Sequence, residues 1–214
     1  EQASITFERA LGWDGYARYV GENRTQIAVN ADAPLDIARA LRLACHEGYP
    51  GHHVQHVLID QLRAERGWPE LQLSPGFGPH LLFTEGAAEA GADLAFAPEE
   101  RTRLYREQLL PAAGLPASDA ETLARVDALV SELVPVVTDV ARLYLSDGIS
   151  KERAIDRLRE EALVLNPEGT LALIERRRAR ALVYGEGRRL VYGMMPGRSL
   201  AELHALFARS IALQ

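Results

Sequence analysis

Four of the six histidines of this 214-residue chain lie close together, at His46, His52, His53 and His56. A glutamate, Glu47, directly follows the first of them. Neutral imidazoles with a nearby carboxylate are the side chains that divalent transition metals, zinc above all, take as ligands. A catalytic zinc also needs a base for the proton of its bound water, and Glu47 is placed for that role. The segment therefore predicts a metal site with hydrolytic chemistry.

The spacing differs from the common His-Glu-x-x-His pattern, in which two histidines four residues apart share one face of a helix. Position 50 is a proline, so that pattern is absent. On an unbroken helix His46 and His53 would share a face. Pro50, however, cannot donate to the carbonyl of His46, and Gly51 permits backbone angles that other residues avoid. We therefore expect a local bulge that bends the chain and returns either His52 or His53 to the metal.

An acidic stripe lies downstream, where Glu85, Glu89 and Asp93 recur at four-residue intervals and so share one face of a helix. A solvated acidic face is the usual explanation of such a stripe. The positions between them are almost all glycine and alanine, however, which predicts that this helix packs closely against another. Two histidines alone rarely hold a catalytic zinc. We therefore predict Glu85 as the third ligand and Glu89 as an acceptor for an imidazole N–H.

Two tyrosines and a basic run near the C-terminus could contact a substrate. Tyr184, Arg188 and Tyr192 recur at four-residue intervals. A tyrosine near the metal can donate to the developing oxyanion, so Tyr184 and Tyr192 are candidates for substrate binding, with core packing as the alternative. The charge run at 175–180 is typical of a solvated face, and a carboxylate-binding patch is the alternative.

Three features together resemble a known family. The run at 46–55, His-Glu-x-x-Pro-Gly-His-His-x-Gln, resembles the signature of a bacterial family of zinc metallopeptidases, domain-of-unknown-function family 885. The run at 84–89, Thr-Glu-Gly-Ala-Ala-Glu, is similar to its second motif. The third feature is the approach segment, with Trp13, Tyr16, Tyr19 and the run Ile-Ala-Val-Asn at 27–30. The resemblance covers residues 10 to 95.

The resemblance implies Zn²⁺ as the cofactor, a peptide as the substrate and a zincin-like helical metallopeptidase domain. It favours His52 over His53 as the metal ligand. It also implies that this chain is the C-terminal part of a longer family architecture with a helical region ahead of it. The family places a Gly-Gln pair and a tyrosine downstream, where this chain has Gly185-Glu186 and a different register of tyrosines.

The pattern of the chain predicts a mainly α fold with at most a small β element near residues 25–30. The rest of residues 1–33 is expected to be irregular. A strand at 25–30 could hold an extended substrate by backbone pairing, if it lies at an edge beside the metal helix, or could be a plain connector. A helix is expected to begin at Asp32 or Ala33, with Pro34 in its first turn, and to deliver His46. Further helices are expected near 53–66, 80–96, 98–110, 118–145, 150–165 and 199–213.

Composition excludes several classes of protein. With 47% hydrophobic and 25% charged residues, the chain is an ordinary globular sequence that fits one domain over 1–214. Its net charge of −6 argues against a general binder of nucleic acid or anionic membranes. No apolar run approaches the ~20 residues of a transmembrane helix, and no signal peptide opens the chain. The single Cys45 excludes an internal disulfide; a soluble protein is expected, with the cytoplasm favoured. The sequence predicts no oligomeric state.

These observations predict a zinc-dependent hydrolase, specifically a metallopeptidase. His46, His52 and Glu85 would hold the metal, and Glu47 would be the base. Two alternatives stay open. The first is a metal-binding domain without catalytic activity. The second is a helical bundle with a two-metal carboxylate site, which normally requires Glu-x-x-His pairs on two helices; the sequence has no such pair.

Overall fold

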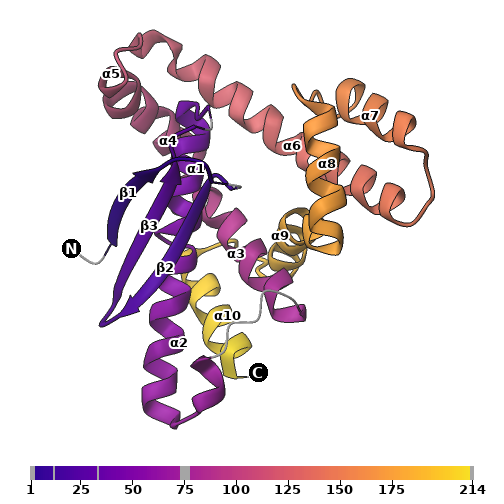
Figure 1. The fold of residues 1–214 in the computed structure, drawn as a ribbon. Helices are drawn as coiled ribbons and strands as arrows, with labels where there is room; N and C mark the ends of the chain where they lie inside the picture. Colours follow the sequence, from indigo (N-terminus) through magenta and orange to yellow (C-terminus); the bar gives the residue numbers. More distant parts are fainter. Residues whose placement is uncertain (1–2, 12, 33, 73–77, 213–214) are drawn as a thin grey trace.

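Helices form most of the structure, and a small sheet lies at the N-terminal end (Figure 1). The computed structural model describes residues 3–11, 13–32, 34–72 and 78–212. The predicted mainly α fold is confirmed. No helix within these ranges is long and apolar enough to cross a bilayer.

The sheet has three strands: β1 (Ala3–Glu8), β2 (Gly15–Gly21) and β3 (Arg24–Asn30). Their order is β1-β3-β2, with β1 parallel and β2 antiparallel to β3. The strand expected near 25–30 is therefore present as β3, but the expectation that the rest of residues 1–33 is irregular was wrong. The expectation overlooked a strand signal, because apolar and polar residues alternate over 3–8, although the apolar side chains of Ile5 and Phe7 are exposed.

The position of β3 corrects the expectation that it could hold a substrate. β3 is the central strand, so both of its edges are already paired with neighbouring strands. Among the described strands, β2 instead has an edge that no other strand covers, and β2 packs beside α1 (Ile37–Glu47) and α2 (His52–Arg66). β2 is therefore the edge strand beside α1 and α2, and the backbone N–H of Ala17 on it donates to the carboxylate of Glu47.

Helix α1 begins later than expected. Its N-cap is Asp36, whose side chain accepts a hydrogen bond from the backbone N–H of Arg39, and such a cap fixes the first turn. The start expected at Asp32 or Ala33 is therefore wrong for Asp32, which lies in a turn; Ala33 lies outside the described residues. The helix then carries His46 in its last turn, as expected.

The predicted bend follows directly. α1 ends at Glu47, a turn with a cis Tyr49–Pro50 peptide bond intervenes, and α2 begins at His52. The turn folds tightly onto the end of α1, because a Cβ atom on Gly51 would lie 1.9 Å from the carbonyl oxygen of His46. Only glycine fits so close to another backbone. The chain can therefore bend within a few residues and bring the start of α2 close to His46, while α2 continues in the general direction of α1 (Figure 1).

Helices α3 (Pro79–Ala95) and α9 (Val183–Met194) meet through two glycines. A Cβ atom on Gly86 would lie 2.0 Å from the carbonyl carbon of Gly187, and one on Gly187 would lie 2.1 Å from the carbonyl oxygen of Leu82. This contact confirms that the small-residue helix packs closely against another. Beside it, α3 and α9 join α10 (Leu200–Ala212) in a core that includes Phe83, Val191 and Phe207.

The remaining helices form a scaffold around these elements. Residue 98 begins a charged segment with α4 (Pro98–Leu104), a π-helical turn (Tyr105–Leu109) and α5 (Leu110–Ala112). Then follow the long α6 (Ala120–Leu145), α7 (Lys151–Glu160), α8 (Pro167–Arg177) and a 3-10 segment (Arg178–Leu182) that leads into α9. Short 3-10 turns lie at Pro69–Gln72 and Ala117–Asp119. Only α7 differs clearly from its expected range, since it ends well before Leu165.

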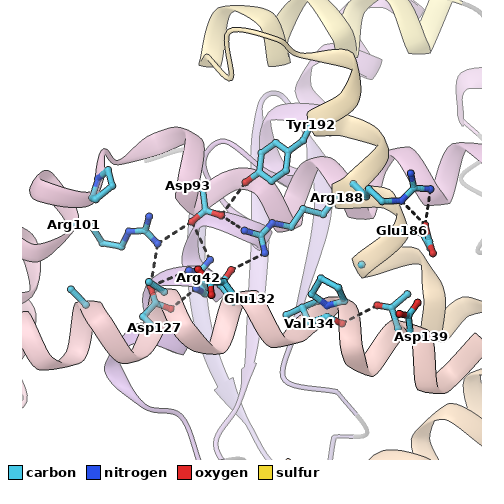
Figure 2. A pocket seen from close by; sticks show the side chains of 18 of the residues that line it. Arg42, Asp93, Arg101, Asp127, Glu132, Val134, Asp139, Glu186, Arg188 and Tyr192 are labelled. Carbon is cyan, nitrogen blue, oxygen red and sulfur yellow. Dashed lines mark hydrogen bonds and ion pairs between the residues drawn. The ribbon is translucent and has the colours of Figure 1, made fainter. Parts of the chain in front are cut away.

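A partly buried charge network joins α1, α3, α4, α6 and α9 (Figure 2). Arg42 donates to Asp127 through Nε and Nη2, at 2.6 and 3.0 Å. Asp93, the last member of the acidic stripe, pairs with Arg101 at 2.9 Å and with Arg188 at 2.5 Å. Both aspartates are acceptors for more than one guanidinium, so the network holds five helices in a fixed relation.

The glycine contact between α3 and α9 can be tested with a matched pair of substitutions on α9. Gly187→Ala should lower the free energy of unfolding by about 1–3 kcal/mol or more, because the new methyl group overlaps the backbone of α3. Gly193→Ala, at a position with no neighbouring atom within 4 Å, should be neutral or raise it by up to about 1 kcal/mol. Urea unfolding of both variants measures the difference. Equal stabilities would contradict the close packing.

Candidate metal centre

Three predicted ligands converge on one point. His46 lies in the last turn of α1, His52 is the first residue of α2, and Glu85 lies on α3. One potential ligand atom from each lies within 4.8 Å of the others. Glu85 Oε2 is 3.4 Å from His46 Nε2 and 3.6 Å from His52 Nε2. This group of two imidazoles and one carboxylate could hold a metal ion.

The structure separates the paired histidines. His52 directs Nε2 to Glu85, whereas His53 points away and places Nδ1 2.8 Å from the hydroxyl of Thr25. His53 is 1% exposed, and its ring packs against Tyr49. Consecutive residues on a helix point about 100° apart, so only one of the two can face the cluster. His52, not His53, belongs to the group that could bind a metal.

Glu89 holds the ring of His46 from the other side. Its Oε1 lies 3.1 Å from His46 Nδ1, one turn of α3 beyond Glu85. A carboxylate that accepts from one ring nitrogen fixes the orientation of the imidazole and its tautomer. Glu89 therefore has the position of the supporting acceptor that the sequence predicts. Nε2 of His46 remains directed at the cluster.

The electrostatics of the cluster favour a cation between its carboxylates. Burial alone would lower the pKa of His46, but hydrogen bonds with Glu85 and Glu89 raise it to about 10. Burial would raise the pKa of Glu85, yet its bonds with His46 and His52 hold that pKa far below the usual range. A positive charge at this point is therefore strongly stabilised, and a divalent ion is one that the donor atoms match.

Glu47 lies beside this group at the end of α1 and is only 5% exposed. Burial raises the pKa of its carboxyl group, and the imidazoles of His46 and His52 partly oppose that rise. Glu47 also lines a cavity of about 720 Å³ together with His46 and Glu89. A carboxylate that borders both a candidate metal position and an open cavity can exchange protons with a molecule bound there.

The cavity runs between the sheet, α1 and α6. Trp13 and Gly15 border it at the start of β2, and Leu173 and Arg177 border it on α8. The wall on α6 is largely apolar, with Leu123, Val126, Val130 and Val134. An extended ligand could thus lie with its backbone beside β2 and its side chains against α6.

The two candidate tyrosines differ in position. Tyr184 lines the cavity, with its ring centroid 6.3 Å from that of His46. Its hydroxyl accepts a hydrogen bond from Arg177 at 3.0 Å. Tyr192 does not line this cavity; its hydroxyl donates to Asp93 at 3.0 Å, and its ring packs against the core. The structure therefore brings Tyr184, and not Tyr192, to the cluster.

His56 also stays outside the metal group. Its ring stacks on that of His52 with centroids 6.1 Å apart, and its buried Nδ1 has no hydrogen-bond partner. Burial, together with the neighbouring His52 and His53, lowers the pKa of His56 to about 4. The ring is therefore neutral at ordinary pH and serves as packing behind His52.

Comparisons with known proteins add no assignment: no family model, no curated protein and no solved structure matches the chain. The resemblance to domain-of-unknown-function family 885 thus stays a prediction from the motifs. The metal group itself rests on the geometry of the described residues.

Substitution of each paired histidine distinguishes their roles. His52→Ala should weaken zinc binding by more than the roughly 10–100-fold that loss of a supporting residue costs, because a donor atom itself is removed. His53→Ala should keep zinc affinity but lower the free energy of unfolding by about 1–3 kcal/mol, since it leaves the buried Thr25 hydroxyl without a partner. Titration with a fluorescent zinc chelator measures affinity, and thermal unfolding measures stability. The reverse pattern would exclude the His52 assignment.

Proposed function

We propose that this protein is a zinc-dependent hydrolase, specifically a metallopeptidase. The observation that carries the proposal is the convergence of His46, His52 and Glu85 on one point, with Glu47 beside them at the wall of a large cavity. The resemblance of the motifs to a bacterial metallopeptidase family supports the same conclusion. So does the position of α1, which carries His46 and Glu47, beside the edge strand β2.

The donor set fits zinc. Two imidazoles and one carboxylate are a set that catalytic zinc sites use, with the fourth position left for water or substrate. The described guanidinium nearest to the Glu85 carboxylate is that of Arg180, whose Nη2 lies 3.8 Å from Oε1. The two histidines contact the other oxygen, Oε2. When bound, zinc would polarise the substrate carbonyl and acidify a water molecule.

Glu47 is the proposed general base. Its carboxylate takes a proton from the attacking water and then passes it to the leaving amine, so that one group serves both halves of the reaction. The preceding residue is a proposed ligand, and therefore the base and the metal position are held by the same helical turn. This fixed relation is what proton transfer in a hydrolase requires.

Tyr184 is the proposed donor to the oxyanion. A tyrosine hydroxyl can accept hydrogen bonds and still donate its own proton. Here the hydroxyl accepts from Arg177, and burial raises its pKa, so its proton is retained for a partner in the cavity. Charge that develops on a carbonyl oxygen beside His46 would be stabilised by such a donor.

The two-metal alternative has no support in the described residues. They contain one group of ligating side chains within mutual reach, built from His46, His52 and Glu85. The other carboxylates of the stripe, Glu89 and Asp93, contact His46 and arginines respectively. A single ion is therefore proposed, and turnover decides between an active enzyme and a metal-binding domain without activity.

The assignment of the base is tested by Glu47→Gln. This variant should keep its zinc and lose about 10²- to 10⁴-fold in kcat, because the amide cannot take up the proton. Zinc content by atomic absorption and hydrolysis of a peptide library by mass spectrometry measure both properties. Glu99→Gln, at an exposed position of α4, is the control and should match the parent. A Glu47→Gln protein that retains zinc and cleaves peptides at the parent rate would rule out this base.

The oxyanion donor is tested by comparison of the two tyrosines. Tyr184→Phe should lower kcat by about 10²–10³-fold with little change in zinc content. Tyr192→Phe should leave kcat near the parent value and instead cost about 1 kcal/mol of stability, because it removes the hydrogen bond to Asp93. Steady-state kinetics and urea unfolding provide the two measurements. Equal kinetic losses in both variants would argue against a specific role for Tyr184.

A further inference from the structure

The arginines of the charge run at 175–180, at the end of α8, do not all face solvent. Arg176 and Arg178 are exposed, as a solvated face requires. Arg177 is half-buried and lines the cavity that also contains His46 and Glu47. The run is therefore more than a solvated face, because one of its guanidinium groups borders the candidate active site.

Arg177 differs from the other arginines of the cavity in its partners. Its one described hydrogen bond goes to the hydroxyl of Tyr184, and no described carboxylate forms an ion pair with it. Each of the other arginines that line the cavity pairs with an aspartate: Arg39 with Asp14, Arg42 with Asp127 and Arg188 with Asp93. A half-buried guanidinium without a counter-charge is suited to bind an anion, and its planar donors match a carboxylate.

The guanidinium also lies at a useful distance from the cluster. Tyr184 separates the two, since its hydroxyl contacts Arg177 while its ring lies beside that of His46. A few residues of extended peptide, at ~3.3–3.6 Å per residue, would span such a gap. A carboxylate held by Arg177 would thus belong to the part of the substrate near the scissile bond.

The cavity that contains Arg177 and His46 also has apolar lining residues on α6. Val126 and Val130 of α6 line it and are 49% and 57% exposed. Exposed valines inside a cavity offer a surface for an apolar side chain of the ligand. The combined surface therefore suits a ligand with an apolar side chain followed by a negative charge.

We propose that Arg177 binds a carboxylate of the substrate, within a few residues of the bond that is cleaved. The inference rests on the proposed function, because it assigns the substrate class of the same site. Two sources share this chemistry: the C-terminal carboxylate of a peptide, which would make the enzyme a carboxypeptidase, and an acidic side chain within a longer peptide. Arg177 is a specificity residue in either case.

Equilibrium binding to three peptides tests the inference without hydrolysis. The probes are N-acetyl-leucyl-leucyl-leucine, its C-terminal amide, and an N-acetyl-leucyl-leucyl-glutamyl peptide with an amidated C-terminus. Calorimetric titration uses Glu47→Gln protein, both zinc-loaded and after removal of metal with a chelator. A C-terminal carboxylate as the true ligand predicts that the free acid binds at least about 10-fold more tightly than its amide. Preference for the glutamyl peptide alone assigns the acidic side chain instead.

Variants of the arginine complete the test. Each substitution is made in the Glu47→Gln protein. Arg177→Met should abolish the preference for the carboxylate-bearing peptide, both with zinc and without it. Arg177→Lys should keep part of this preference, because a positive charge remains. Arg176→Met, the exposed neighbour, should leave it unchanged. Thermal unfolding verifies that each variant is folded.

The inference is overturned if all three peptides bind equally, if none binds at millimolar concentration, or if the preference survives in Arg177→Met. These outcomes are distinct from failure of the proposed function. A protein that shows the Arg177-dependent preference while the parent cleaves no peptide would refute the peptidase and keep the carboxylate site. A parent protein that cleaves the free-acid, amide and glutamyl peptides equally well would refute the carboxylate site and keep the peptidase.

Discussion

The contact of the Gly48–Gly51 turn with the end of α1 is the constraint on which the site depends. Gly51 packs against the carbonyl oxygen of His46 at a distance that excludes any side chain. Because the chain bends there, two histidines that a continuous helix would separate face the same carboxylate. The backbone thus determines the ligand geometry, and the side chains follow from it. Gly91 of α3 extends the contact, since it lies against the carbonyl of Cys45.

Helix α3 contributes three acidic residues with three different tasks. Glu85 faces both imidazoles, Glu89 fixes the ring of His46, and Asp93 binds arginines of neighbouring helices. Each successive carboxylate lies one turn further from the cluster. The stripe therefore links the candidate metal position to the charge network of the scaffold, which anchors the C-terminal part of the helix that carries Glu85.

Much of the site could be predicted from the sequence. Pro50 and Gly51 indicate the bend between the two histidines, and the small residues around Glu89 indicate a closely packed helix pair. The strand β1 could also have been predicted, because apolar and polar residues alternate over 3–8. Two features could not be predicted. Tyr184 and Tyr192 lie on one face of α9 but two turns apart, and so they contact different residues. Tyr184 contacts Arg177, and Tyr192 contacts Asp93. Arg177 belongs to a charge run whose register changes where α8 gives way to a 3-10 segment, and sequence spacing does not reveal which member turns inward.

The glycine pair between α3 and α9 has a consequence for how the site comes into existence. Gly86 directly follows Glu85, and its partner Gly187 lies in the last part of the chain. All three donor residues, and the surface of α1 on which α3 packs, are present once α3 has been synthesised. The second surface, on α9, is made only near the end of the chain. The helix that carries Glu85 therefore gains its closest backbone contact last, from a residue that has no side chain.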